Sequence, residues 1–410
     1  MSLKRIAIVG GGPAGAFAAT ELARAGREVF LFDEKLAWEK PCGGGLTDKA
    51  ITRWPFLRDA PVEKNWISDC ELIAPSGRKA SFKLDRQIAI YSRLTLNGLM
   101  LDRAREAGAN IVRERIVEIS GSAGNWSLRS ASMNRVVDFV VIAAGARNPF
   151  RNQFCGPLGP ENFMIATGYY VPGTHHTVQI KFVKGLHGYF WIFPRADHFS
   201  AGICGRMLGA QTSELRRILD QSLAECGLDS QGAQFYAHII PSLNSESLQN
   251  AVFSGEGWAV AGDAAGFVDA ITGEGLYYAL RSAELCSKAL LSETPQLYSE
   301  YIRQDFLPEL DRAARLADRF YSSKWLGGNA LERMVQFTNR SASFRDLMQD
   351  LFAGTQEYRG LRQRLRRTLP AIVAEAMVST LRKDRQSRHP GPKTSATSGK
   401  ERMAGAGNRT

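Results

Sequence analysis

Residues 6–15 read Ile6-Ala7-Ile8-Val9-Gly10-Gly11-Gly12-Pro13-Ala14-Gly15, an apolar run followed by a Gly-x-Gly-x-x-Gly turn. This pattern predicts a β-strand, a phosphate-binding turn and the start of a helix. Gly10 allows the tight turn, Gly12 lets phosphates approach bare backbone, and Gly15 lets helix and strand pack closely. Pro13 falls at the first helical position, where it loses no N–H partner. The unpaired amides at such a helix end predict a site for the pyrophosphate of a dinucleotide.

The residues that follow support this prediction. A helix is expected over residues 13–25, ending at Gly26, and a second strand over residues 28–32. Asp33 ends that strand, 18 residues beyond Gly15 (33 − 15), which is close to the ~20 expected for the carboxylate that binds a ribose. Glu34 is the competing candidate, but alternation along the strand favours Asp33. The alternative to a dinucleotide site is a glycine turn in an ordinary α/β unit.

Composition limits the class of protein. The chain has 410 residues, 44% hydrophobic and 23% charged, which is typical of a globular protein large enough for two cores. No apolar run approaches the ~18–20 residues that cross a bilayer. The six cysteines are scattered, which favours free thiols in the cytoplasm. The histidines show no metal-ligand spacing, so we expect no metal.

The net charge of +11 is concentrated at the C-terminus. Residues 382–410 hold eight Lys or Arg and two acids, so they contribute +6 (8 − 2), and the other 381 residues contribute +5 (11 − 6). This distribution argues against a nucleic-acid partner. The segment is poor in apolar residues and is predicted to be a disordered basic tail. Weak, peripheral attraction to anionic lipid at the inner face of the membrane is the sharper hypothesis.

Alternating patterns divide the chain into different kinds of segment. Residues 66–90 predict antiparallel strands with a turn at 75–77, and a helix is expected over 93–107. The remaining predicted strands are 110–119, 125–130, 136–143 (as one strand buried on both faces), 163–171, 176–183, 188–193, 199–204 and 257–261, with a helix near 212–226. Residues 300–381 are predicted to be helical. Their apolar stripe contains Leu361, Leu365, Leu369, Val373, Met377 and Leu381. Such a stripe usually faces a core, and a membrane-facing role is the alternative.

A second motif, Gly262-Asp263-Ala264-Ala265-Gly266, follows the predicted strand 257–261. An acid at a strand end, flanked by small residues, can accept hydrogen bonds from sugar-alcohol hydroxyls. Such a bond to a charged acceptor contributes roughly 1.5–3 kcal/mol. Combined with the N-terminal turn, the motif resembles the glutathione-reductase-type FAD enzymes, in the branch of the p-hydroxybenzoate hydroxylases. The resemblance implies that Asp263 binds the ribityl chain and that Arg93 matches the arginine opening a helix in that branch.

Three further segments are similar to the geranylgeranyl reductase family. They are Lys40-Pro41-Cys42-Gly43-Gly44-Gly45-Leu46, Tyr189-Phe190-Trp191-Ile192-Phe193-Pro194 and Asp269-Ala270-Ile271-Thr272-Gly273-Glu274-Gly275. Ala270 stands where the family has proline, and Cys204 stands at a family glycine. Tryptophan halogenases carry a related aromatic element, but Tyr189 and Phe193 match the reductases. A strand face packed in a core is the alternative for the aromatic residues. Ala144-Gly145 replaces the hydroxylase Asp-Gly, which argues against NAD(P)H handling of the hydroxylase kind.

The resemblance implies a fold class, domains and site residues. The fold is α/β: a Rossmann-type FAD/NAD(P)-binding domain with an inserted, mainly antiparallel β substrate domain and a C-terminal helical region. The implied divisions are 1–65, 92–150 and 251–299 for FAD, 66–91 and 151–250 for substrate, 300–381 for the helical region, and 382–410 for the tail. The implied cofactor contacts are Gly10, Gly12, Ala14, Gly15, Asp33, Gly43, Gly44, Arg93, Gly145, Gly262, Asp263, Gly273 and Gly275. The implied substrate contacts are Tyr189, Trp191, Phe193 and Pro194.

The implied activity is FAD-dependent reduction of carbon–carbon double bonds in an isoprenoid chain carried by a lipid, prenyl diphosphate or quinone. Cys42 is the candidate for positioning the alkene or delivering a proton, and a small buried hydrophobe is its alternative reading. A flavin-dependent monooxygenase or halogenase is the alternative function, and a non-catalytic flavoprotein is a third. NAD(P)H, ferredoxin and a quinol are all compatible as electron donors.

Overall fold

The computed structural model describes residues 3–209, 211–322 and 330–388, with side chains described up to residue 381. Residues 389–410 of the predicted tail lie outside the described residues. Residues 382–388, predicted to be disordered, instead end the long helix α13 (Tyr358–Arg388). This part of the prediction is wrong because Arg, Lys and Gln are good helix formers, so an existing helix can continue through them.

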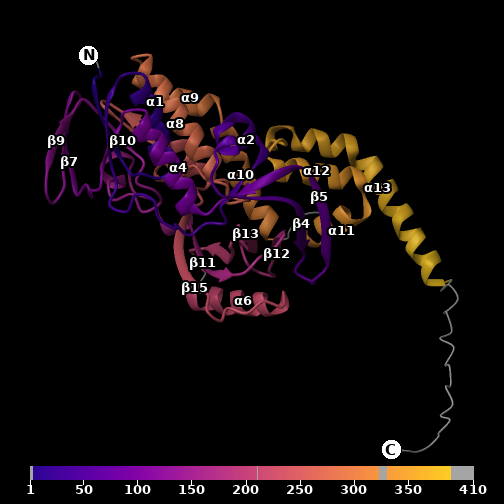
Figure 1. Ribbon diagram of the computed structural model, residues 1–410. Coiled ribbons are helices and arrows are strands. Elements are labelled where there is room, and N and C mark those ends of the chain that lie inside the picture. Colours follow the sequence, from indigo (N-terminus) through magenta and orange to yellow (C-terminus); the bar gives the residue numbers. More distant parts are fainter. Residues whose placement is uncertain (1–2, 210, 323–329, 389–410) are drawn as a thin grey trace, which may run out of the picture.

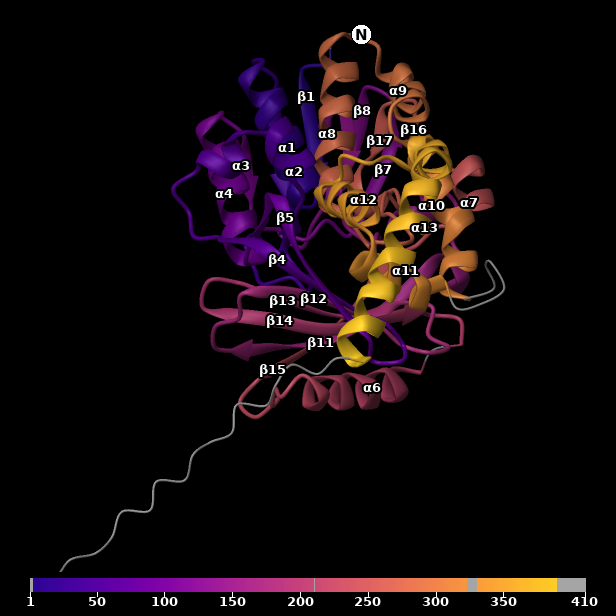
Figure 2. The same ribbon diagram turned by 90° about the vertical axis from the view of Figure 1, so that its right-hand side faces the viewer.

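A six-stranded sheet contains the N-terminal motif. Its order is β16-β17-β10-β1-β2-β6, parallel except for β16. The strands are β16 (Ser254–Gly255), β17 (Trp258–Val260), β10 (Phe139–Ile142), β1 (Arg5–Val9), β2 (Glu28–Phe32) and β6 (Asn110–Val112). The strands β1 and β10 are apolar and buried because helices cover such a sheet on its faces. The helices α1 (Pro13–Arg24), α4 (Arg93–Glu106) and α8 (Leu276–Leu291) lie together beside the sheet (Figure 2).

The strand predicted over residues 136–143 is in fact two strands. The strand β9 (Asn134–Val137) pairs in a separate three-stranded sheet with β8 (Asn125–Arg129), which also pairs with β7 (Glu118–Ser122). Asp138 separates β9 from β10, and its carboxylate accepts hydrogen bonds from the amide and guanidinium of Arg5, each at 2.8 Å. These bonds hold a bend that a continuous apolar pattern does not reveal. The predicted run 110–119 is likewise divided between β6 and β7.

An eight-stranded sheet forms the second layer, in the order β15-β11-β14-β13-β12-β4-β5-β3. The strands are β15 (Gln234–Pro241), β11 (Phe163–Pro172), β14 (His198–Arg206), β13 (Tyr189–Pro194), β12 (Thr177–Phe182), β4 (Asn65–Ile73), β5 (Lys79–Ile90) and β3 (Gly45–Leu46). All neighbours are antiparallel except β12 and β4. The helix α6 (Thr212–Glu225) packs below this sheet (Figure 2). The sheet confirms the predicted, mainly antiparallel second layer.

Helices complete the structure. The α-helices not yet given are α2 (Asp48–Arg53), α3 (Phe56–Asp59), α5 (Arg151–Phe154), α7 (Ser245–Asn250), α9 (Tyr298–Gln304), α10 (Leu307–Tyr321), α11 (Ala330–Arg340) and α12 (Ala342–Ala353). Short 3₁₀ turns are η1 (Pro160–Asn162), η2 (Gly262–Ala264) and η3 (Pro295–Leu297). Within the described residues, each helix is too short or too polar to span a bilayer.

The apolar stripe of α13 departs from its predicted core position. Leu361 and Leu365 are half-buried, but Leu369, Met377 and Leu381 are more than half exposed. Figure 1 shows the reason: the second half of α13 runs outward, away from the two sheets. The three-stranded sheet lies at the opposite end of the molecule.

Candidate functional site

A cavity of about 1790 Å³ connects the N-terminal turn, the eight-stranded sheet and the C-terminal helices. Of the residues predicted to bind a cofactor, eleven line it: Gly10, Gly12, Ala14, Asp33, Gly43, Gly44, Arg93, Gly145, Asp263, Gly273 and Gly275. Tyr189, Trp191 and Phe193 line it from β13. The structure therefore brings most of the predicted site residues to one space, although they come from distant parts of the chain.

The three motif glycines differ in their surroundings. A Cβ on Gly10, whose φ is +111°, would lie 2.2 Å from the carbonyl oxygen of Ala143, and one on Gly15 would lie 1.9 Å from that of Gly10. A Cβ on Gly12 would meet nothing within 4 Å. Gly10 and Gly15 thus allow close packing, whereas Gly12 leaves open space beside the start of α1. That helix begins with no side chain capping it, so its amides are available to an anion.

Asp33 ends β2 at the edge of the cavity, as predicted. One carboxylate oxygen accepts a hydrogen bond from the amide of Gly11 at 2.7 Å. The other accepts from the amides of Lys35 and Leu36 at 2.8 and 2.7 Å. An ionised carboxylate offers about four lone-pair positions, so these three bonds fix the group and leave capacity for a ribose hydroxyl.

Lys40 pairs with Asp263 across the cavity, at 2.9 Å between Nζ and Oδ2. Burial acts to raise the pKa of Asp263, but the charge and hydrogen bond of Lys40 hold that pKa below its usual range. Gly262, with φ +62°, brings this turn against α1, where its Cβ would lie 3.0 Å from the Cβ of Ala14. Gly15 and Gly262 are not among the described residues that line the cavity, so their geometry indicates close packing.

Two buried nitrogens in the cavity wall lack a hydrogen-bond partner among the described residues. Arg93 is 4% exposed at the start of α4, and its Nη2 donates to Asn97 at 3.3 Å while its Nε is unpaired. His238 of β15 has an unpaired Nε2. Burial first, and then the charge of Lys40, lower the pKa of His238 to about 3. Buried polar atoms normally have a partner, and these two nitrogens are available to polar groups of a ligand in the cavity.

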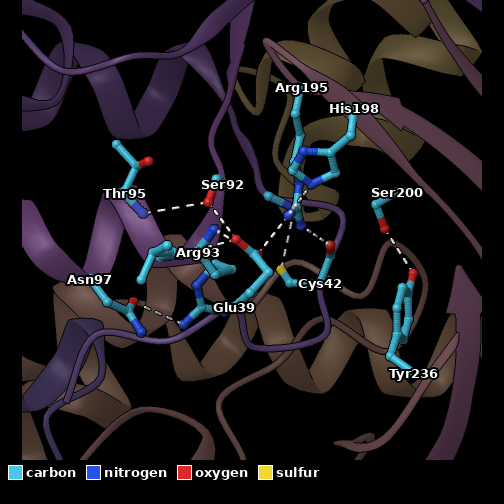
Figure 3. Close-up of polar contacts among 12 residues, drawn as sticks. Glu39, Cys42, Ser92, Arg93, Thr95, Asn97, Arg195, His198, Ser200 and Tyr236 are labelled. Carbon is cyan, nitrogen blue, oxygen red and sulfur yellow. Dashed lines mark hydrogen bonds and ion pairs between the residues drawn. The ribbon is translucent and has the colours of Figure 1, made fainter. Parts of the chain in front are cut away.

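A buried ion pair holds the loop that contains Cys42 (Figure 3). Arg195 is 1% exposed, and its Nη1 lies 2.5 Å from Oε1 of Glu39. Its Nη2 donates to the carbonyl oxygen of Cys42 at 2.7 Å. Glu39 also accepts hydrogen bonds from the Ser92 hydroxyl and the Arg93 amide. One guanidinium therefore connects β13, the Cys42 loop and the start of α4.

The Cys42 thiol lies at the cavity wall and accepts a hydrogen bond from the amide of Gly44 at 3.3 Å. The ring of Phe193 lies against the following glycines: a Cβ on Gly43 would be 2.9 Å from it, and one on Gly45 would be 3.0 Å from it. Gly44 has a φ of +84°, and its Cβ would lie 2.0 Å from the carbonyl oxygen of Tyr91. Glycine at these positions lets the thiol loop lie directly on the aromatic strand.

Some residues of the aromatic strand β13 line the cavity, and others support the cavity wall. The Tyr189 hydroxyl donates to the carbonyl oxygen of Thr272, next to Gly273. The Trp191 Nε1 donates to the Ser200 hydroxyl at 3.4 Å. Pro194 is buried, its carbonyl accepts from Asn65 at 3.2 Å, and it is not among the described cavity-lining residues. The strand thus also holds the loop 269–275, a contact between two motifs that the sequence analysis treated separately.

Glu274 is a cavity residue to which the sequence assigned no role. Its Oε1 accepts a hydrogen bond from the Thr47 hydroxyl at 3.0 Å. Burial raises the pKa of Glu274 to about 7, so its carboxyl group is substantially protonated near neutral pH. A titratable carboxyl of this kind in a cavity is a candidate acid. The sequence signal that could have found it is its position between two glycines of a predicted cofactor loop.

Fold and site together define a Rossmann-type protein with a dinucleotide-binding turn that opens into a large cavity. A profile of NAD(P)-binding Rossmann-like domains matches residues 8–38. Geranylgeranyl diphosphate reductase from Synechocystis is 26% identical over 82% of this chain and 86% of its own length. Digeranylgeranylglycerophospholipid reductase from Methanoculleus marisnigri is 27% identical over 69% of this chain and 75% of its own length.

Solved structures share the fold. A geranylgeranyl bacteriochlorophyll reductase-like protein from Thermoplasma acidophilum has a TM-score of 0.72 and 18% identity, covering 92% of this chain and 98% of that one. A flavin-dependent brominase has a TM-score of 0.64 and 16% identity, and the match covers 85% of this chain and 93% of the brominase. Over most of its length the chain is therefore similar to proteins named geranylgeranyl reductases, and it shares its fold with flavin-dependent enzymes.

The cavity residues fit FAD. Gly12 leaves open space at an uncapped helix start, Asp33 has spare acceptor capacity, and Arg93 and His238 carry unpaired buried nitrogens. Asp263 is a charged acceptor held in place by Lys40. These groups match a pyrophosphate, a ribose and a ribityl chain in chemistry. The described residues contain no cluster of three or more His, Cys, Asp or Glu that could hold a metal ion.

Asp263→Ala is expected to weaken FAD binding by about 10- to 150-fold, because a hydrogen bond to a charged acceptor contributes ~1.5–3 kcal/mol. Titration of flavin-free protein with FAD, followed by quenching of flavin fluorescence, measures the change. Asp138→Ala is the matched control, since Asp138 pairs with Arg5 and is not among the described cavity-lining residues. Wild-type affinity in Asp263→Ala would contradict the assignment.

Proposed function

We propose that this protein reduces carbon–carbon double bonds of an isoprenoid chain, using FAD. The observation that carries the proposal is the continuous cavity, which joins the dinucleotide turn to an aromatic strand and then to apolar residues of α12 and α13. Among its lining residues are Phe182, Trp191, Phe193, Met348, Leu351, Phe352, Leu361 and Leu365. Burial of each methylene contributes ~0.8 kcal/mol, so such a lining holds a long hydrocarbon chain.

The names of the relatives support this substrate class. The Synechocystis relative is named for geranylgeranyl diphosphate and the Methanoculleus relative for a digeranylgeranyl glycerophospholipid. Both names contain the same prenyl group on different carriers. The proposed substrate is therefore a prenyl chain on a lipid, diphosphate or quinone, with NAD(P)H, ferredoxin or a quinol as the source of electrons.

An isolated double bond is apolar and gives a protein no charged handle, so orientation comes from shape and from exclusion of water. When bound and reduced, FAD supplies the hydride. The protein supplies the second hydrogen as a proton, and the protonated Glu274 carboxyl at the cavity wall is our proposed donor. Cys42 is proposed to position the alkene, because its thiol lies in the wall on a loop fixed by Arg195.

Anaerobic mixing of dithionite-reduced protein with geranylgeranyl diphosphate tests the proposed reaction. Flavin reoxidation, with a product two mass units heavier for each reduced bond, is the expected result, since each bond gains a hydride and a proton. Reoxidation that requires oxygen, with peroxide or an oxygenated product, would replace this proposal with the monooxygenase alternative. Supplying NAD(P)H, ferredoxin or a quinol without dithionite identifies the electron donor.

Cys42→Ala is expected to keep FAD bound and to slow alkene reduction by about tenfold, because the substrate would be less well oriented without the thiol. The readout is the rate of flavin reoxidation at saturating substrate. Cys155→Ala is the control, because Cys155 is also a half-buried free thiol but is not among the described cavity-lining residues. Full activity in Cys42→Ala with FAD bound would exclude the role.

A further inference from the structure

The outer half of α13 carries an exposed apolar face made of Leu369, Val373, Met377 and Leu381. Their exposed fractions are 54%, 37%, 62% and 63%. The spacing of four residues places them in one row along the helix. Ile372, by contrast, is 2% exposed and lines the cavity. The apolar face is thus exposed to solvent, although α13 also has a buried side.

The same helix is strongly basic. Residues 358–381 contain five arginines and a single acid, Glu375. Glu375 accepts hydrogen bonds from the hydroxyls of Ser341 and Ser343 at 2.6 and 2.8 Å, so it is engaged by the start of α12. Arg362 and Arg366 are exposed. All five arginines lie within residues 359–367, so positive charge is presented at the inner end of the apolar face, where it complements an anionic surface.

The apolar face is continuous with the cavity. Leu361, Leu365 and Leu369 line the cavity, and Leu369 is also the first member of the exposed row. Arg362 and Arg366 line it on the same helix segment. In Figure 1, α13 runs from the body of the molecule outward, so the row leads from the cavity toward the surface. A hydrocarbon chain could follow it without leaving an apolar surface.

We propose that α13 docks this protein on the surface of an anionic lipid bilayer. The apolar row enters the boundary between headgroups and acyl chains, and the neighbouring arginines contact lipid phosphates, as in other interfacial helices that are basic on one side. The cavity then opens toward the bilayer. The docking does not depend on the reaction assigned to the cavity, so vesicle binding and catalysis can succeed or fail separately.

Flotation of the FAD-loaded, full-length protein with lipid vesicles tests the proposal. Vesicles of phosphatidylcholine with about 30% phosphatidylglycerol are expected to carry the wild-type protein, and pure phosphatidylcholine vesicles about tenfold less. The double substitution Val373→Asp/Met377→Asp is expected to lower the bound fraction at least about tenfold by placing charge in the apolar row. Arg362→Gln/Arg366→Gln is expected to reduce the preference for anionic vesicles.

The matched control is Val117→Asp/Leu208→Asp, which adds the same charge at exposed apolar residues elsewhere (52% and 64% exposed). It should float like the wild type, while flavin content and thermal unfolding show that each variant is folded. Equal flotation of wild type and Val373→Asp/Met377→Asp would overturn the proposal. So would loss of flotation in the control, loss on removing residues 389–410 alone, or a wild-type dimer that the double substitution dissociates.

Discussion

Glu274→Gln is expected to slow flavin reoxidation by the isoprenoid substrate by ~10²–10⁴-fold, the usual contribution of a positioned general acid. Glutamine keeps the size of the side chain and can still accept a hydrogen bond from Thr47, but it cannot release a proton. The bound flavin should therefore remain, and only the rate should change. Glu284→Gln is the control, because Glu284 is an acid paired with Arg53 and Arg281 and is not among the described cavity-lining residues.

The dependence on pH separates an acid from a merely structural group. Burial raises the pKa of Glu274 from its ordinary 4.5 to about 7, so the protonated form is fully present at low pH and is lost as the pH rises through about 7. The wild-type rate should fall about tenfold per pH unit above that value, and this fall should be absent in Glu274→Gln. By linkage, the stabilisation from this group is present below pH 4.5 and lost as the pH rises through about 7. An unchanged pH profile in Glu274→Gln would contradict the role.

Arg195→Met is expected to lower the free energy of unfolding by about 1–3 kcal/mol, because it leaves a mostly buried carboxylate without its cationic partner. The uncompensated group is Glu39. Burial acts to raise the pKa of Glu39, but Arg195 and the hydrogen bonds from Ser92 and the α4 amides hold that pKa below its usual range. Glu39 therefore contributes stability that is present above its ordinary pKa and lost as the pH falls, and Arg195→Met should weaken this acid dependence.

Urea unfolding of the flavin-free protein measures the effect of Arg195→Met. Arg5→Met is the control, since Arg5 also pairs with an aspartate but is 43% exposed at its side chain, and exposed pairs contribute about 0–1 kcal/mol. The Cys42 loop should also loosen, which faster chymotrypsin cleavage after Trp38 would report. If Arg195→Met and Arg5→Met lost the same stability, the Arg195–Glu39 pair would not have the role described here.

Local sequence patterns predicted the nucleotide-binding half well. The glycine turn, α1 and β2 follow the predicted ranges because each element has its own periodicity and its own terminator at Gly26. The strand over 136–143 was predicted less well, since Asp138 creates a bend through bonds to Arg5, 133 residues away. The outer stripe of α13 was misread as core because periodicity shows that a face is apolar but not what covers it.

The site residues were also predicted only where their role depends on local sequence. Motifs found the residues that form turns, such as Gly12 and Asp263, because their chemistry depends on local backbone shape. They did not assign Lys40 to Asp263 or Arg195 to Glu39, because these pairs join residues 223 and 156 positions apart. The raised pKa of Glu274 could not be predicted from the sequence either, because it arises from burial, which depends on the whole fold.

The ring of Phe193 lies on the glycine loop and restricts which residues can replace Gly43 and Gly45. A methyl group at position 43 or 45 would lie 2.9 or 3.0 Å from that ring, so an alanine there requires the ring to shift or a smaller residue on β13. Orthologues with a bulkier loop should therefore show a compensating change at position 193. We therefore expect substitutions in the Cys42 loop and at position 193 of β13 to occur together.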